Sequence, residues 1–180
     1  MRWKNSATTW VRPLHSILCI YNGVVVPGSV NFPAIDGGED LVFQFSNISK
    51  GHRFLSVKPL VIKDFQNYRE QLKKAKVILS FSERKEIIES GAKALADKAG
   101  LHLREDKALI DEVAGLTEWP VPYMGTIDSD FLSLPSEILV VAMRSHQKYF
   151  VTEDNNGNLA NKFILVASTE SADRGKSIVQ

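Results

Sequence analysis

Residues 80–100 constrain the fold most, because the sequence specifies both ends of a helix there. Ser80 and Glu83 have the spacing of a capping box, in which side chains and backbone N–H groups bond reciprocally in the first turn. Gly100 is the residue type that most often follows the last turn of a helix. The apolar face predicted for this helix comprises Ile87, Ile88, Gly91, Ala94, Leu95 and Ala99. A chain built around this helix must cover that face with other elements.

The N-terminal half reads mainly as short strands. We predict a strand over residues 15–21, a two-residue turn at Asn22-Gly23 and a return strand over 24–30. Pro27 marks an edge or a bulge in that return strand. Three further runs have the length and composition of strands, at residues 41–45, 57–62 and 76–80.

Helices and a closing hairpin dominate the rest of the chain. Asp64 is placed to cap a helix that carries Phe65, Tyr68 and Leu72. Further helices are predicted over 105–115 and from Pro135 to residue 147, and a hairpin over 148–168. Residues 119–127 are strand-like but interrupted by two prolines, so they lie at a sheet edge or are irregular. The pattern has no regular βαβ repeat, so it predicts one mixed α+β domain over residues 1–180, with antiparallel hairpins and three to four helices.

Charge is unevenly distributed although the net charge of the chain is only +1. Residues 50–85 hold ten basic and three acidic residues, a net of +7, whereas residues 86–137 hold four basic and eleven acidic residues, a net of −7. Such a distribution can turn a basic face toward a polyanion. It can equally produce two oppositely charged surfaces that pair with each other, and the sequence leaves both interpretations open.

Composition and motifs exclude several classes of protein. No apolar run approaches the roughly 18 residues that a membrane-spanning helix needs, and the N-terminus lacks the apolar stretch of a signal peptide. Cys19 is the only cysteine, so no disulfide framework or cysteine-based zinc cluster is possible. Phosphate-binding glycine loops are absent, and the four histidines lack metal-ligand spacing. We therefore expect no catalytic residue, cofactor or metal ligand in this chain, no membrane association, and a cytoplasmic location.

An ordered set of motifs resembles one family. The motifs are MRW (1–3), VRPLH (11–15), GHRF (51–54), KVILSFSERKEII (76–88), EVAGLTEWPV (112–121), MRSHQKYF (143–150) and KFILVAS (162–168). Their order and spacing are similar to those of the beta subunit of the bacterial heterotetrameric glycyl-tRNA synthetase. The resemblance extends from Met1 to about residue 171, nearly the whole chain.

This resemblance implies that the chain is an internal fragment of a longer beta subunit. The family's alpha subunit carries the ATP and glycine site, where Mg acts with ATP, and two copies of each subunit form the tetramer. The beta subunit recognises tRNA. The resemblance therefore implies a non-catalytic domain that supports tRNA binding and subunit architecture during translation, and a fragment that is inactive alone. It also implies a fold similar to the editing domain of the phenylalanyl-tRNA synthetase beta subunit.

Five cations are the candidate RNA-binding residues: Arg53, Arg84, Lys85, Arg144 and Lys148. Arg53 lies in GHRF, where Gly51 is expected to give a bend and Phe54 to anchor the turn in the core. The alternative is a structural turn whose arginine pairs with a local carboxylate. Arg84 and Lys85 lie in the first turn of a helix, where the helix dipole disfavours cations, so losing those charges should leave folding intact. Arg144 and Lys148 near a helix end also suit the dipole.

Two other functions stay open at this point. One is an editing-type pocket that hydrolyses mischarged aminoacyl-tRNA, by analogy with the phenylalanyl enzyme. The other is a structural spacer that docks neighbouring domains. Analogy of fold is a weak guide to function, and a synthetic site for glycine can reject larger amino acids by steric exclusion.

Overall fold

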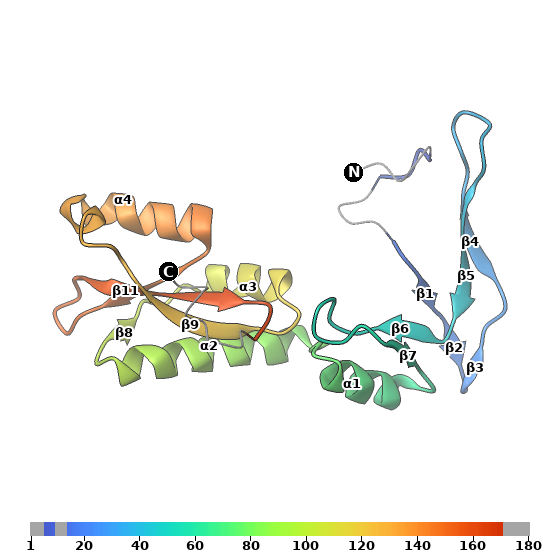
Figure 1. Cartoon of the computed structure of the whole chain (residues 1–180), viewed down its shortest axis with the longest axis horizontal. Coiled ribbons are helices and arrows are strands. Elements are labelled where there is room, and N and C mark those ends of the chain that lie inside the picture. Colours follow the sequence, from blue (N-terminus) through green and yellow to red (C-terminus); the bar gives the residue numbers. More distant parts are fainter. Residues whose placement is uncertain (1–5, 10–13, 171–180) are drawn as a thin grey trace. The chain divides into compact units, whose positions relative to one another are not determined.

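The chain forms two compact units, Met1–Ala75 and Lys76–Gln180, which we call the N-terminal and C-terminal units (Figure 1). The computed structural model describes residues 6–9 and 14–170, so the MRW motif and most of VRPLH lie outside the described residues. The mixed α+β class is confirmed, with four α-helices and mainly antiparallel sheets among the described residues. The single domain over residues 1–180 remains a prediction, since it requires the two units to unfold together.

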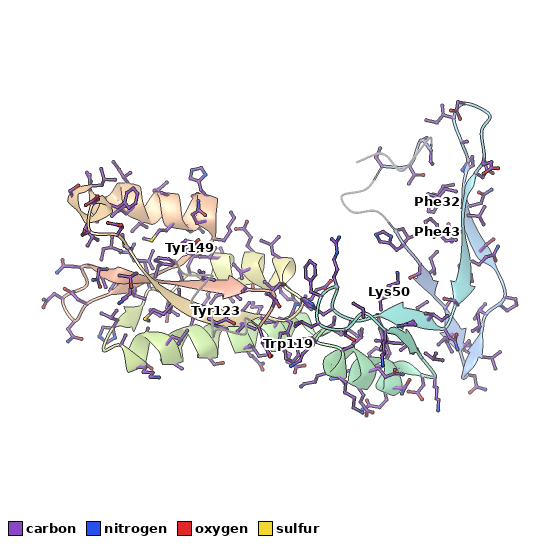
Figure 2. All side chains as sticks on the ribbon, in the orientation of Figure 1. Phe32, Phe43, Lys50, Trp119, Tyr123 and Tyr149 are labelled. Atoms are coloured by element: carbon purple, nitrogen blue, oxygen red, sulfur yellow. The ribbon has the colours of Figure 1, made fainter. Side chains whose placement is uncertain are left out.

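Small sheets and one helix make up the N-terminal unit. Its elements are β1 (Ile17–Leu18), β2 (Ile20–Tyr21), β3 (Val24–Val25), β4 (Ser29–Phe32), β5 (Leu41–Ser46), β6 (Ile48–Lys50), β7 (Pro59–Val61) and α1 (Phe65–Lys74). The sheets have the orders β1-β5-β4, β2-β3 and β6-β7. Phe32 and Phe43 meet edge to face across β4 and β5, with ring centroids 6.0 Å apart (Figure 2).

The Asn22-Gly23 turn is confirmed, but the strands around it are shorter than predicted. Asn22 and Gly23 both have positive φ, at 46° and 78°, as this turn requires. The strand predicted over 15–21 divides at Cys19, because its N–H donates to the carbonyl of Ser46 while its carbonyl accepts from the N–H of Val26. The chain thus passes from the sheet containing β5 to the β2-β3 hairpin. The return strand likewise breaks, into β3 and β4, between which Pro27 lies.

A four-stranded antiparallel sheet organises the C-terminal unit. Its elements are α2 (Phe81–Lys98), β8 (His102–Leu103), α3 (Lys107–Leu116), β9 (Val121–Thr126), η1 (Phe131–Ser133), α4 (Ser136–Val141), the π-helix η2 (Ala142–Gln147), β10 (Phe150–Glu153) and β11 (Leu159–Ala167). The strand order is β8-β10-β11-β9, so β9 is an edge strand, one of the two alternatives that its prolines left open. The closing hairpin is confirmed as β10 and β11.

Helices cover both faces of this sheet. Phe150 and Ile164 lie opposite each other and pack into a cluster with α2 and α3. The next pair along the strands, Val151 and Phe163, faces the other way and packs with Leu139 of α4 and Met143 of η2. Figure 1 shows the sheet between α4 and α2, in an arrangement of helices on both faces.

Both predicted ends of the long helix are confirmed. The Ser80 side chain accepts a hydrogen bond from the N–H of Glu83 at 3.2 Å, and Gly100 follows the C-cap with a φ of 70°. The buried stripe differs from the one predicted. Ile88, Ala92 and Ala96 are fully buried, one turn apart, whereas Ala94 and Ala99 are exposed. The cap at Asp64 is also confirmed, because its carboxylate accepts from the N–H of Asn67 at 2.7 Å.

Two predicted elements are corrected. Residues 76–80 form no strand. Lys76 has a φ of 60°, and the hydrogen bond from the N–H of Ile78 to the carbonyl of Glu118 is a lone contact without a ladder. Ile78 is buried nevertheless, which explains the apolar run. The helix that follows Pro135 begins as predicted, but its second half, Ala142–Gln147, is a π-helix that ends at Lys148 in the left-handed region.

Candidate nucleic-acid interface

Three of the five candidate cations pair with acidic residues at α3. Lys85 pairs with Asp111, Arg144 with Asp106 at 2.5 Å, and Lys148 with Glu112 at 2.7 Å. Asp106 is also the N-cap of α3, and its carboxylate accepts from the N–H of Leu109 at 2.9 Å. These pairs connect α3 to α2 through Lys85, and to residues in and after η2 through Arg144 and Lys148. Of these three pairs, only Lys85–Asp111 joins the basic segment 50–85 to the acidic segment 86–137.

Arg84 is bound differently, through backbone carbonyls. Its Nη1 donates to the carbonyls of Ile78 at 2.6 Å and Leu79 at 3.0 Å, and its Nε donates to the carbonyl of Ala114 at 2.9 Å. The guanidinium thus joins the segment before α2 to the end of α3. These carbonyl contacts explain why Arg84 lies in the first turn of α2, where the helix dipole disfavours positive charge. They also overturn the expectation that Arg84 can be replaced without cost to folding.

Asp106 has a lowered pKa. The hydrogen bond from Arg144 is the main cause of the shift below the ordinary value of 3.8, and the N–H of Leu109 lowers the pKa further. A carboxyl group whose pKa is lower in the folded state stabilises that state above its unfolded pKa. This stabilisation is lost as the pH falls through the folded pKa.

Replacing Asp106 with asparagine should therefore lower the free energy of unfolding by an amount that depends on pH. Asparagine is still a good N-cap, so the variant loses chiefly the charge interaction with Arg144. We expect the free energy of unfolding to fall by about 0.5–1 kcal/mol at neutral pH, because the pair is partly exposed. Urea unfolding of the chain and the variant over a range of pH measures this difference. It should vanish in acid, below the folded pKa, and a difference that stayed constant with pH would contradict the assignment.

The N-terminal unit presents a different kind of cationic surface, at the loop between β6 and β7. We call residues 51–58 the 51–58 loop. Lys50 and Pro59 are paired across the two strands, so the loop leaves and re-enters the hairpin at one place. Lys50, Arg53 and Lys58 are exposed, and among the described residues none of the three forms an ion pair. Figure 2 shows Lys50 projecting from β6.

His52 holds the 51–58 loop together. It is 5% exposed, and its Nδ1 accepts hydrogen bonds from the N–H groups of Phe54 and Leu55, both at 3.2 Å. Its own N–H donates to the carbonyl of Ala75 at 2.9 Å, and its carbonyl accepts from the N–H of Ser56 at 2.9 Å. The sequence did not indicate a role for His52 in the turn. The structure instead makes it the buried centre of the turn.

Gly51 is needed for close packing. A Cβ at this position would lie 2.4 Å from the Cβ of Ala75 and 2.8 Å from its carbonyl oxygen. The turn therefore rests directly on the C-terminal end of α1. The predicted anchor of the turn was wrong, because Phe54 is 74% exposed and His52 is buried in its place. Arg53 has no carboxylate partner among the described residues, and its guanidinium carbon lies 5.5 Å from the centre of the Phe54 ring.

Charge in this part of the N-terminal unit is strongly positive. Residues 50–75 hold seven basic residues (Lys50, Arg53, Lys58, Lys63, Arg69, Lys73 and Lys74) and two acidic ones (Asp64 and Glu70), a net of +5. Lys58 and Phe54 were not named as site residues from the sequence. Phe54 was expected in the core, and Lys58 lay inside the strand predicted over 57–62, whereas the structure places both in the loop before β7.

The described residues include no group of three or more His, Cys, Asp or Glu side chains that could hold a metal ion. None of the helices described is long and apolar enough to cross a membrane.

Comparison with known proteins identifies the family. The family model described as "Glycyl-tRNA synthetase beta subunit" matches residues 1–180. The chain is 42% identical to the glycine–tRNA ligase beta subunit of Rhodospirillum centenum, covering 99% of the chain and 27% of the relative. It is 44% identical to that of Phenylobacterium zucineum, covering 97% of the chain and 25% of the relative. The chain thus spans about a quarter of the length of the curated relatives it matches. It belongs to the glycyl-tRNA synthetase beta subunit family.

Proposed function

We propose that this chain is a non-catalytic, tRNA-binding part of a glycine–tRNA ligase beta subunit. In this proposal the ATP, Mg and glycine sites belong to an alpha subunit, and the complete cytoplasmic enzyme is an α2β2 tetramer. The chain alone makes no glycyl-adenylate. The observation that carries tRNA binding is the 51–58 loop, where exposed cations with no carboxylate partner in the described part of the chain surround a turn fixed by His52.

The ligand that best matches this cationic surface is a phosphate group. The positive charge of residues 50–75 attracts a polyanion, and lysine and arginine that are not engaged with carboxylates can contact phosphate at little cost. The other four candidates already have partners within the C-terminal unit. Contact of Arg84, Lys85, Arg144 or Lys148 with RNA remains a prediction, and the loop is the stronger candidate.

The test is the salt dependence of tRNA binding by the full-length enzyme. Each phosphate contact contributes about −0.7 to −0.9 to the slope of log K against log salt. Replacing Lys50, Arg53 and Lys58 together by glutamine should therefore weaken binding and flatten the slope by about two to three units. The three side chains are exposed, so the fold should remain intact.

Two further variants make this test selective. Lys93 is an exposed lysine of α2 that is not a candidate, and Lys93→Gln should leave the slope unchanged. Lys85→Gln examines the site first predicted from the sequence, and a slope flattened by about one unit in this variant would support it. An unchanged slope in the loop variant, with its circular dichroism unaltered, would reject the 51–58 loop as a tRNA contact.

A structural role is the second candidate for the C-terminal unit. The ion pairs at α3 and the carbonyl contacts of Arg84 account for four candidate cations without RNA. If Lys85, Arg144 and Lys148 are each replaced by glutamine without effect on tRNA affinity, this unit supports the architecture of the subunit and the tRNA contacts lie elsewhere.

A further inference from the structure

The 51–58 loop exposes an aromatic ring beside its cations. Phe54 is 74% exposed, and Val57 nearby is 81% exposed. Single exposed apolar residues are ordinary on protein surfaces, whereas neighbouring ones mark contact sites. The apolar residues here lie between Arg53 and Lys58, so the contact partner must suit both an aromatic ring and positive charge.

The position of Phe54 is fixed before any partner arrives. Its N–H donates to the buried Nδ1 of His52, and the two rings lie 6.2 Å apart at an angle of 56°. The Arg53 guanidinium is 5.5 Å from the ring centre, within the range of a cation–π contact. Most of the ring surface still faces solvent. The backbone that carries the ring is therefore already ordered, and only the side-chain torsions of Phe54 have to be fixed when a flat partner stacks on it.

We propose that Phe54 is a stacking platform for an unpaired nucleobase of RNA, with Arg53, Lys50 and Lys58 at the adjoining phosphates. This inference rests on the proposed tRNA-binding function and defines which part of the RNA the loop takes. Bases in a duplex have both faces covered by their neighbours, so only a single-stranded end, loop or bulge can present a free face. Aromatic rings combined with a basic groove are the usual platform for single strands.

A protein partner fits the loop less well. An apolar protein surface would cover Phe54 and Val57, but it would also have to neutralise Lys50, Arg53 and Lys58, which have no ion-pair partners among the described residues. A single strand supplies bases and phosphates in alternation, which matches a ring flanked by cations. The excess of positive charge over residues 50–75 favours the same partner.

The experiment compares Phe54→Leu and Phe54→Trp in the full-length enzyme. The probes are a short single-stranded RNA that carries a fluorescent adenine analogue and a blunt RNA duplex of the same sequence. Phe54→Leu keeps an apolar side chain but removes the ring, and it should weaken single-strand binding by about 5- to 100-fold. Binding of the duplex and the salt slope should not change, because no phosphate contact is lost. Phe54→Trp should retain the affinity and the quenching of the analogue.

The outcomes separate this inference from the function on which it rests. If Phe54→Leu binds the single strand as well as the parent does, while the glutamine variant of the three cations flattens the salt slope, the inference fails and the proposed function stands. If neither Phe54→Leu nor the glutamine variant changes RNA binding, the stacking inference and the proposed function both fail at this loop. If Phe54→Leu leaves RNA binding intact but weakens association with the alpha subunit, the ring is a protein contact and the inference is overturned.

Discussion

Replacing Arg84 with glutamine is expected to lower the free energy of unfolding by about 2–4 kcal/mol. The variant loses three hydrogen bonds from a charged donor to the carbonyls of Ile78, Leu79 and Ala114. Hydrogen bonds that involve charged groups contribute about 1.5–3 kcal/mol each. These three are only partly buried or exposed, so water replaces part of what is lost and the total falls below the sum of three such bonds. Glutamine is too short to reach all three. Urea unfolding of the chain, followed by circular dichroism, measures the change.

Lys85→Gln is the matched control, because it removes the same charge from the next residue of the same helix turn. Lys85 forms a single ion pair with Asp111, and both side chains are more than one third exposed. Such pairs contribute about 0–1 kcal/mol, and losing a cation from the first turn of a helix relieves part of that cost. We expect little change in stability. Equal destabilisation by the two substitutions would contradict the structural role assigned to Arg84.

Features specified by neighbouring residues were predicted well from the sequence. The caps at Ser80 and Asp64 and the turn at Asn22-Gly23 each depend on two to four consecutive residues, and all are confirmed. Features that depend on residues distant in the sequence were not predicted well. Residues 76–80 have the composition of a strand, but no second strand pairs with them. His102 and Leu103 form a strand only because β10 lies beside them.

In the candidate site too, the sequence predicts features set by neighbouring residues and misses those set by distant ones. Arg53 is exposed, as a candidate contact residue must be, and its contact with RNA remains a prediction. The sequence could not show which cations already have partners. Asp106 is 38 residues from Arg144 along the chain, and only the fold brings the two together. The role of His52 was missed because its hydrogen bond to Ala75 joins the turn to the end of α1.

Gly51→Ala is expected to destabilise the chain by about 2–3 kcal/mol, the upper part of the range of about 1–3 kcal/mol for atoms added to a packed site. The new methyl group would meet both the side chain and the carbonyl oxygen of Ala75, and the Cβ of Ser56 lies 3.0 Å away. The 51–58 loop and the end of α1 would have to separate. That movement breaks the hydrogen bond from His52 to Ala75, which fixes the turn.

Gly115→Ala provides the control for Gly51→Ala, because it adds the same methyl group where nothing lies within 4 Å. Gly115 is an exposed residue of α3, so alanine should be neutral or stabilise the chain by up to about 1 kcal/mol. The functional effects should differ too. Gly51→Ala retains every cation of the loop, yet it should weaken tRNA binding by the full-length enzyme, since Arg53 and Phe54 lose the turn that positions them. If Gly51→Ala lowers stability but leaves tRNA affinity unchanged, the loop does not need its His52-centred shape to bind RNA, and charge alone accounts for its contribution.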